Sequence, residues 1–184
     1  IQLGKQLMVS KDYIDLDAMK LGMKDIFTGK KPRLSNDEMR SAMTAYQESK
    51  KKSELAMMGK FSSHNKKEGA QYLATNKKKK GVKTLASGLQ YKVLKSGNGK
   101  HPKATDTVVT HYHGTLIDGT VFDSSVDRGQ AVSFPVNAVI KGWTEALMKM
   151  KVGDKWQLVI PANLAYGEQG APPKIGPGAT LIFD

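Results

Sequence analysis

Cysteine is absent from this sequence, and its absence removes several kinds of chemistry at once. Disulfide bonds, a thiol nucleophile and thiolate metal sites are all excluded, while the redox compartment stays open. No apolar run approaches the length of a membrane-spanning helix. Aromatic residues make up only 7% of the chain, and Trp143 and Trp156 are its two tryptophans. Trp143 stands at the start of an expected short helix, in VIKGWTEAL, so its place in the fold needs a specific explanation.

Proline is missing between residues 34 and 101, which permits one long uninterrupted helix. Ser35 followed by Glu38 fits a capping box at its start, and apolar residues then recur at four- and three-residue steps from Met39. If continuous to about Lys80, the helix would run roughly 65–70 Å at about 1.5 Å per residue. Because its middle is polar on all sides, we expect an exposed stalk.

The residues before this helix predict shorter helical pieces. DLDAMKLGMKDIFTGK has Asp15 or Asp17 placed to cap a helix and Gly29 placed to end it, and residues 1–9 predict another. Seven of the nine methionines lie before residue 60. Short helices are marginal in isolation, so we expect this region to self-associate. An adaptable surface that binds client proteins is the alternative, since methionine repacks easily.

Acidic residues are scarce in the first part of the chain. Residues 1–84 hold 19 Lys/Arg against 9 Asp/Glu, whereas residues 85–184 hold 10 against 8, within a net charge of +12. The lysines form short clusters without interleaved aromatic residues, which favours a solvated helix face over specific nucleic-acid binding. Peripheral attraction to an anionic surface is the remaining alternative.

The pattern changes to β-strands after Leu85. GLQYKVLKSG alternates, DTVVTHYHGTLIDGTVF predicts a long strand pair with a turn at Asp118–Gly119, and AVSFPV, DKWQLVIP and ATLIFD predict further strands. AVIKGWTEALMKM is the one convincing helix. The fold class is therefore α+β, with a C-terminal antiparallel sheet folded over one short helix and an all-α region before it. The expected domains are short helices and a dimerisation region at 1–34, a long connecting helix and linker at 35–84, and the β-rich domain at 85–184.

Four segments in order, VVTHYHGTLIDGTVFDSS, VIKGWTEAL, IPANLAYGEQG and GATLIF, resemble the FKBP-type peptidyl-prolyl cis–trans isomerases. The preceding helices and GVKTLASGLQYKVLKSGNG are similar to the bacterial Mip (macrophage infectivity potentiator) group. The resemblance implies an exported protein, in the periplasm or at the outer-membrane surface, that forms a homodimer through its N-terminal helices. Since the chain begins at Ile1 and stops at Asp184, where relatives continue the strand, we expect both ends to be trimmed.

The resemblance also implies a dry, mostly aromatic pocket that takes a proline ring. Trp143 would form its floor, the Tyr166 hydroxyl would donate to a substrate carbonyl, and the Ile140 backbone N–H would be a further donor. Asp123 would orient Tyr112. The implied catalytic residues are Tyr112, Asp123 and Tyr166, and the implied substrate contacts are Phe122, Arg128, Val132, Phe134, Val139, Ile140, Trp143, Ile175 and Phe183. Taken singly, most of the aromatic residues would equally suit a core, Asp123 a turn cap and Arg128 a solvated surface.

The implied activity is rotation of X–Pro bonds in unfolded or flexible proline-containing polypeptides, with tacrolimus and rapamycin as macrolide inhibitors. Rotation crosses a barrier of about 18–20 kcal/mol, and X–Pro is the bond for which both isomers are well populated. An apolar pocket favours the twisted, less polar imide, so no cofactor is expected. A dimeric holdase that binds clients in its helical cleft is the alternative function.

Three features depart from this pattern or extend it. Val132 replaces an aromatic residue common in relatives, and Ala171 and Lys174 stand where larger or apolar residues are common, which would alter substrate preference. His111 and His113 share one face of an expected strand, as a metal-binding pair would. No third ligand is evident at useful spacing, so we expect no metal site.

Overall fold

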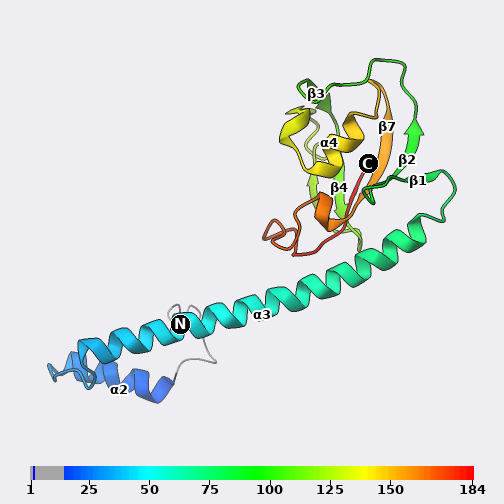
Figure 1. Cartoon of the computed structure of the whole chain (residues 1–184). Coiled ribbons are helices and arrows are strands. Elements are labelled where there is room, and N and C mark those ends of the chain that lie inside the picture. Colours follow the sequence, from blue (N-terminus) through cyan, green and yellow to red (C-terminus); the bar gives the residue numbers. More distant parts are fainter. Residues whose placement is uncertain (1, 3–14) are drawn as a thin grey trace. The chain divides into compact units, whose positions relative to one another are not determined.

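The structure is a computed structural model that describes residue 2 and residues 15–184 (Figure 1). The chain divides into two compact units, residues 1–56 and residues 57–184, and one long helix contributes residues to both. The helix expected within residues 1–9 falls almost entirely outside the described residues.

Helix α2 (Leu16–Phe27) belongs to the first unit and has the predicted cap. The Asp15 carboxylate accepts the backbone N–H groups of Asp17 and Ala18 at 2.9 and 3.0 Å, which satisfies donors that the first helical turn leaves free. Asp17 lies inside the first turn, where its negative charge suits the helix dipole. The chain leaves the helix through Gly29, whose φ of 68° is in the left-handed region.

Helix α3 (Asn36–Asn76) begins with the predicted capping box. The Ser35 N–H and hydroxyl donate to the Glu38 carboxylate at 2.7 and 2.8 Å, and the Glu38 N–H donates back to the Ser35 hydroxyl. The helix ends at Asn76, four residues before the expected Lys80. The buried Asn76 amide donates to the Gln90 side chain at 2.9 Å, which ties the last turn to the following strands.

Helix α3 is exposed at most of its positions, as expected for a stalk, but its second half also packs on other residues at three of them. Within the C-terminal unit, α3 buries Ser62, Gly69 and Asn76 against residues from the β-rich part of the chain. A Cβ atom on Gly69 would lie 2.2 Å from Thr180 Oγ1, so the glycine is required by close packing. No helix among the described residues is both long and apolar enough to cross a membrane.

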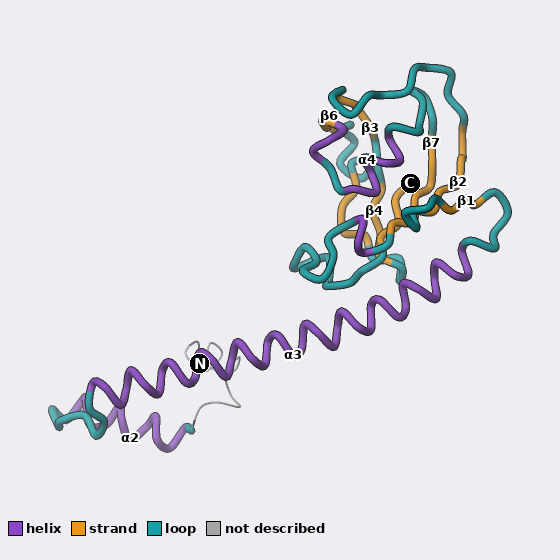
Figure 2. Tube along the Cα trace, in the orientation of Figure 1, coloured by secondary structure: helices purple, strands orange, loops and turns teal. Residues whose placement is uncertain are grey.

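The C-terminal unit is built on a six-stranded antiparallel sheet and a separate two-stranded one (Figures 1 and 2). Strand order in the large sheet is β1-β2-β7-β8-β4-β5, and β3 pairs with β6 in the small sheet. The three-residue strand β1 was not expected from the sequence. The bounds are β1 Val82–Thr84, β2 Gln90–Lys95, β3 Thr107–Thr110, β4 His113–Leu116, β5 Val121–Ser124, β6 Val132–Pro135, β7 Lys155–Ile160 and β8 Leu181–Phe183.

The long strand pair expected in residues 106–122 is interrupted at Tyr112. Its second part forms the predicted hairpin, β4 and β5, closed by the turn at Asp118–Gly119. Its first part, β3, pairs with β6 instead. The interruption has a local cause, because the Tyr112 N–H donates to the Ser125 hydroxyl at 2.7 Å and the Tyr112 carbonyl accepts the Ser125 N–H at 2.9 Å.

Helix α4 (Lys141–Leu147) lies against the large sheet near β7, preceded by the 3₁₀ turn Val136–Ala138 (Figure 1). Gly142 makes this contact possible, because a Cβ atom there would lie 2.5 Å from Ile160 Cγ2. The glycine thus permits close helix–sheet packing and sets Trp143 between α4 and the sheet. Leu89, Val136, Ile160 and Leu181 are fully buried in this core.

Candidate active site

A cavity of about 680 Å³ lies between the β4–β5 hairpin, α4 and the loop that leads into β8. Three regions of the chain that lie far apart in sequence meet around it. Its lining is mostly apolar and comprises Tyr112, Phe122, Asp123, Phe134, Ala138, Val139, Ile140, Trp143, Tyr166, Ala171, Pro172, Pro173, Lys174, Ile175 and Phe183.

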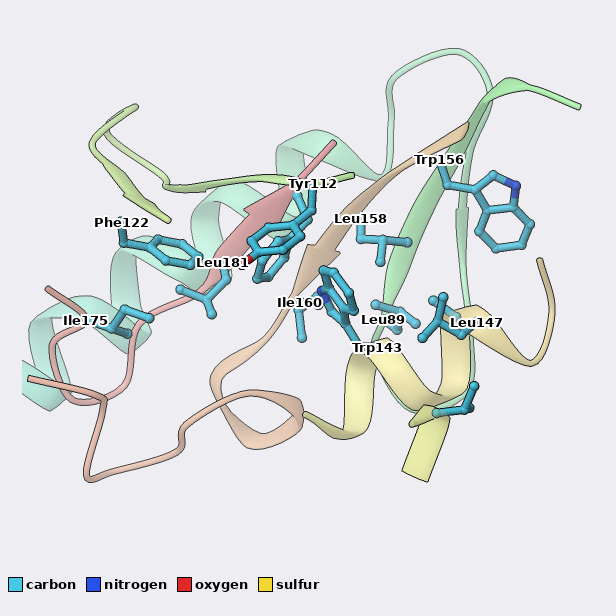
Figure 3. Close-up of a cluster of buried hydrophobic side chains, with 13 residues drawn as sticks. Leu89, Tyr112, Phe122, Trp143, Leu147, Trp156, Leu158, Ile160, Ile175 and Leu181 are labelled. Carbon is cyan, nitrogen blue, oxygen red and sulfur yellow. The ribbon is translucent and has the colours of Figure 1, made fainter. Parts of the chain in front are cut away.

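Trp143 is the centre of an aromatic cluster at this cavity. Its ring meets those of Tyr112, Phe134 and Phe183 edge to face, with centroids 5.3, 5.6 and 5.2 Å apart. Each such pair contributes about 0.5–1.5 kcal/mol beyond the area it buries. Figure 3 shows Tyr112 and Trp143 side by side within the buried cluster. Trp143 therefore belongs to the core and at the same time forms part of the cavity surface.

Phe122 and Phe183 close another side of the cavity, and a glycine makes room for them. Their rings lie edge to face with centroids 5.4 Å apart. A Cβ atom on Gly114 would come within 2.7 Å of the Phe122 ring and 3.0 Å of the Phe183 ring. Any larger residue on this part of β4 would push the rings apart.

Tyr112 and Asp123 form a polar part of the cavity lining, and both are hydrogen-bonded to Arg128, which lies outside the lining. The Tyr112 hydroxyl donates to one oxygen of the Asp123 carboxylate, and the Arg128 guanidinium donates to the other. Arg128 also donates to the Tyr112 hydroxyl oxygen at 3.1 Å and lies over the Tyr112 ring. Charge-assisted bonds of this kind fix both the carboxylate and the ring that it holds.

These contacts set the protonation states of the group. Partial burial acts to raise the pKa of the Asp123 carboxyl, but the hydrogen bonds from Tyr112 and Arg128 together outweigh it, so the pKa lies below its usual range. Burial raises the pKa of the Tyr112 hydroxyl, and its bond to Asp123 raises it further, with Arg128 offsetting only part. At neutral pH the site therefore holds a carboxylate and a neutral phenol.

Tyr166 is the exposed aromatic residue of the site. It follows the 3₁₀ turn Ala162–Leu164, and its side chain lines the cavity while the residue remains 41% exposed. Its hydroxyl has no hydrogen-bond partner within the part of the chain that the structure describes. The group is therefore free to donate to a bound molecule.

Ten of the twelve site residues named from the sequence line this one cavity. Arg128 is not part of the lining and acts through Asp123 and Tyr112. Val132 is not part of it either, because it lies two residues before Phe134, about 7 Å away along β6, and packs against the core. Residues that were not assigned to the pocket also line it, namely Ala138, Ala171, Pro172, Pro173 and Lys174.

Lys174 is the most distinctive of these additional residues. Its ammonium donates to the backbone carbonyl of Phe122 at 2.8 Å, which links the loop 166–178 to strand β5 across the cavity. The family resemblance indicated Lys174 as a departure from the usual pattern, but its contact with β5 could only be found from the fold.

The two histidines of HYH bind neighbouring serine side chains. His113 Nδ1 lies 2.9 Å from the Ser124 hydroxyl, and His111 Nδ1 lies 3.4 Å from that of Ser125. No group of three His, Asp or Glu side chains within residues 15–184 is arranged to hold a metal ion.

Both parts of the chain match family profiles of known proteins. Residues 98–184 match the family profile described as FKBP-type peptidyl-prolyl cis–trans isomerase, and residues 1–93 match the domain amino-terminal to it. Peptidyl-prolyl cis–trans isomerase Mip of Coxiella burnetii is 43% identical over all of this chain and 80% of its own length. Outer membrane protein MIP of Legionella longbeachae is 41% identical over 98% of this chain and 78% of its own.

A solved structure extends the likeness to the fold. The crystal structure of FkpA from Escherichia coli matches all of this chain and 88% of that one, with a TM-score of 0.82 and 42% identity. Both the helical region and the β-rich unit are therefore shared with known members. The chain belongs to the family of FKBP-type peptidyl-prolyl cis–trans isomerases.

Proposed function

We propose that the cavity around Trp143 binds the proline ring of an X–Pro segment in an unfolded or flexible polypeptide and accelerates its rotation. The observation that carries this proposal is the construction of the cavity: an aromatic cluster encloses an apolar space, and the Tyr166 hydroxyl, which has no partner among the described residues, stands beside it. Such a space fits a small apolar ring and places the Tyr166 hydroxyl within reach of the peptide next to it.

The apolar lining supplies the first contribution to catalysis. A planar amide is strongly dipolar and well solvated, whereas the twisted imide has lost its conjugation and is less polar. Transfer into a dry aromatic cavity therefore favours the twisted state over the planar one. Only such a difference between the two states lowers the barrier, because equal binding of both would not change the rate of rotation.

Hydrogen bonds supply the second contribution. We assign the Tyr166 hydroxyl and the Ile140 backbone N–H as donors to carbonyl groups that flank the rotating bond. Tyr112 and Asp123 shape the polar edge of the cavity, and Arg128 neutralises the carboxylate. None of them acts as a general base, since no proton has to be transferred when the imide turns.

A protease-coupled assay with proline peptides tests these assignments. Tyr166→Phe removes one neutral hydrogen bond, and a loss of about 0.5–1.5 kcal/mol corresponds to about a two- to twelvefold lower kcat/KM. Asp123→Ala should also slow the reaction, because it frees Tyr112 and Arg128. Tyr91→Phe is the matched control, since Tyr91 stacks on Trp156 and does not line the cavity. Unchanged rates in both site variants would overturn the assignments.

Macrolide binding gives a second, independent measurement. We expect tacrolimus and rapamycin to occupy the cavity and change the fluorescence of Trp143. A Trp156→Phe variant isolates that signal, because only these two tryptophans occur in the chain. If the fluorescence change disappears in this variant, it came from Trp156, and the ligand binds outside the cavity around Trp143.

The helical region is proposed to form a homodimer, with residues 1–34 as the dimerisation region and residues 35–84 as the connecting segment. Large apolar side chains that are exposed in a single chain support this, among them Leu16, Ile26 and Phe27 of α2 and Met43 of α3. No feature of the described residues favours the holdase alternative over isomerisation.

Export to the periplasm or the outer-membrane surface is proposed from the relatives. The relative from Legionella longbeachae carries the name outer membrane protein MIP. Fractionation of the source bacterium with an antibody against this chain tests the location, and recovery with the cytoplasmic fraction would contradict it.

A further inference from the structure

The loop that follows Tyr166 rests on the second half of helix α3, within the C-terminal unit. The Ser62 hydroxyl and the Lys66 ammonium each donate to one oxygen of the Glu168 carboxylate. Asn65 donates through its side-chain amide to the carbonyl of Pro177 at 2.8 Å. Residues 62, 65 and 66 share one face of the helix, so a single helical turn holds both ends of the loop.

The two ends of this loop are also joined to each other. The Gly178 N–H donates to the Gly167 carbonyl at 2.8 Å, next to the residues that α3 holds. Gly178 has a φ of 72°, and a Cβ atom there would lie 2.7 Å from the Ser62 carbonyl oxygen. The loop and the helix therefore touch at backbone level, and little freedom remains for the base of the loop.

The same loop forms one wall of the cavity. Tyr166 stands at its start, and Ala171, Lys174 and Ile175 line the cavity from its middle. Because the Tyr166 hydroxyl has no partner among the described residues, the position of this side chain depends on the loop backbone. Glu168, only two residues farther along, is the point at which α3 fixes that backbone.

We propose that Ser62, Asn65 and Lys66 are positioning residues of the isomerase site, and that they hold the Tyr166 loop in its productive conformation through Glu168 and Pro177. The helix would thereby contribute to catalysis as well as connecting two parts of the protein. The inference rests on the isomerase function proposed for this cavity. The Lys66 and Glu168 side chains are 52% and 63% exposed, so their ion pair is open to screening by salt.

Measurement of kcat/KM on a proline peptide by a protease-free NMR exchange assay, with the full chain, tests the proposal. Lys66→Ala and Glu168→Gln should each lower kcat/KM about two- to fivefold at about 0.01 M salt, as expected for an exposed ion pair. Raising the salt to about 1 M should lower the wild-type value toward that of the variants and change the variants little. The exchanged pair Lys66→Glu with Glu168→Lys should restore most of the activity and the salt dependence.

Lys67→Ala is the matched control, since Lys67 is the next lysine on α3 and has no ion-pair partner among the described residues. It should keep the wild-type activity and salt response. A purely structural contact would lower the unfolding midpoint of the Lys66 and Glu168 variants while leaving kcat/KM and its salt dependence unchanged, and that result would overturn the proposal. A loss in Lys66→Ala without any loss in Tyr166→Phe would instead remove the role given to Tyr166 and leave the positioning effect standing.

Discussion

Asp123 is the residue on which the polar side of the cavity depends. Its carboxylate binds the Tyr112 hydroxyl with one oxygen and Arg128 with the other, so it holds an aromatic wall and a cation at once. Its side chain is 42% exposed, which keeps the ion pair in contact with solvent. We therefore expect its substitution to act through the orientation and ionisation of Tyr112 more than through overall stability.

Replacing Asp123 with Asn should lower the pKa of Tyr112. The carboxylate raises that pKa through its hydrogen bond and its charge, whereas Arg128 lowers it, and only Arg128 remains charged in the variant. NMR titration of the chain with ¹³C-labelled tyrosine measures the change. The Tyr112→Phe variant identifies the resonance, and an unchanged or higher pKa in Asp123→Asn would contradict the assigned contacts.

Asp123→Asn should also make the free energy of unfolding depend less on pH in the acid range. Because the pKa of Asp123 is lowered by folding, its contribution to stability is complete above the unfolded value of about 3.9 and is lost as the pH falls through the folded value. Urea unfolding from pH 7 down to about pH 3 compares the two proteins. Their difference in the free energy of unfolding should shrink on acidification; a difference independent of pH would show that the charge is not involved.

Within helix α3, two glycines allow the effect of helix propensity on stability to be distinguished from the effect of side-chain packing. Nothing lies within 4 Å of a Cβ atom built on Gly59, whereas one on Gly69 would meet Thr180 Oγ1 at 2.2 Å. Gly59→Ala should therefore stabilise the C-terminal unit by about 0.5–1 kcal/mol. Gly69→Ala should destabilise it by about 1–3 kcal/mol, since Thr180 is buried and has little room to move.

Urea unfolding followed by tryptophan fluorescence measures both changes, because both tryptophans lie in this unit. Opposite signs for the two substitutions are the expected result. Equal effects would mean that the second half of α3 does not pack on the β-rich part of the C-terminal unit as described.

The elements that the sequence predicted correctly are those encoded by neighbouring residues. Asp15 and the Ser35–Glu38 capping box act within one helical turn, and the Asp118–Gly119 turn closes a hairpin locally. Helix α3 ends at Asn76, a few residues before the expected position near Lys80, and its last residue binds Gln90 on another element. Contacts of that kind leave no periodic pattern in the sequence.

In the candidate site, too, some features were predictable from the sequence, whereas others depend on contacts between distant residues. Ten of its residues were identified by family resemblance, because order and spacing carry them. Whether Val132 lines the cavity depends on how far β6 extends past it. The contact from Lys174 to the Phe122 carbonyl depends on the conformation of the folded loop. Likewise, nothing near Glu168 in the sequence indicates that it meets Ser62 and Lys66, about a hundred residues away.

At the scale of the whole molecule, the two units differ in how they bury apolar side chains. The C-terminal unit encloses its own core around Trp143, Ile160 and Leu181. In the described part of the first unit, Ile26 and Phe27 are 74% and 84% exposed. Short helices with such surfaces gain stability by packing against another surface, and in the proposed homodimer a second copy of the chain would supply one.

The full chain should therefore have about twice its monomer mass of 20.1 kDa when measured by light scattering after size exclusion. Phe27→Lys and Ile26→Lys should shift it to the monomer, because a charge would be buried without a partner in the interface. Leu94→Lys is the control, since Leu94 is an exposed apolar residue of the C-terminal unit. Activity per chain on a short proline peptide should not change, because the cavity lies wholly in the C-terminal unit. A monomeric wild-type chain, or dimers in both variants, would refute the proposed interface.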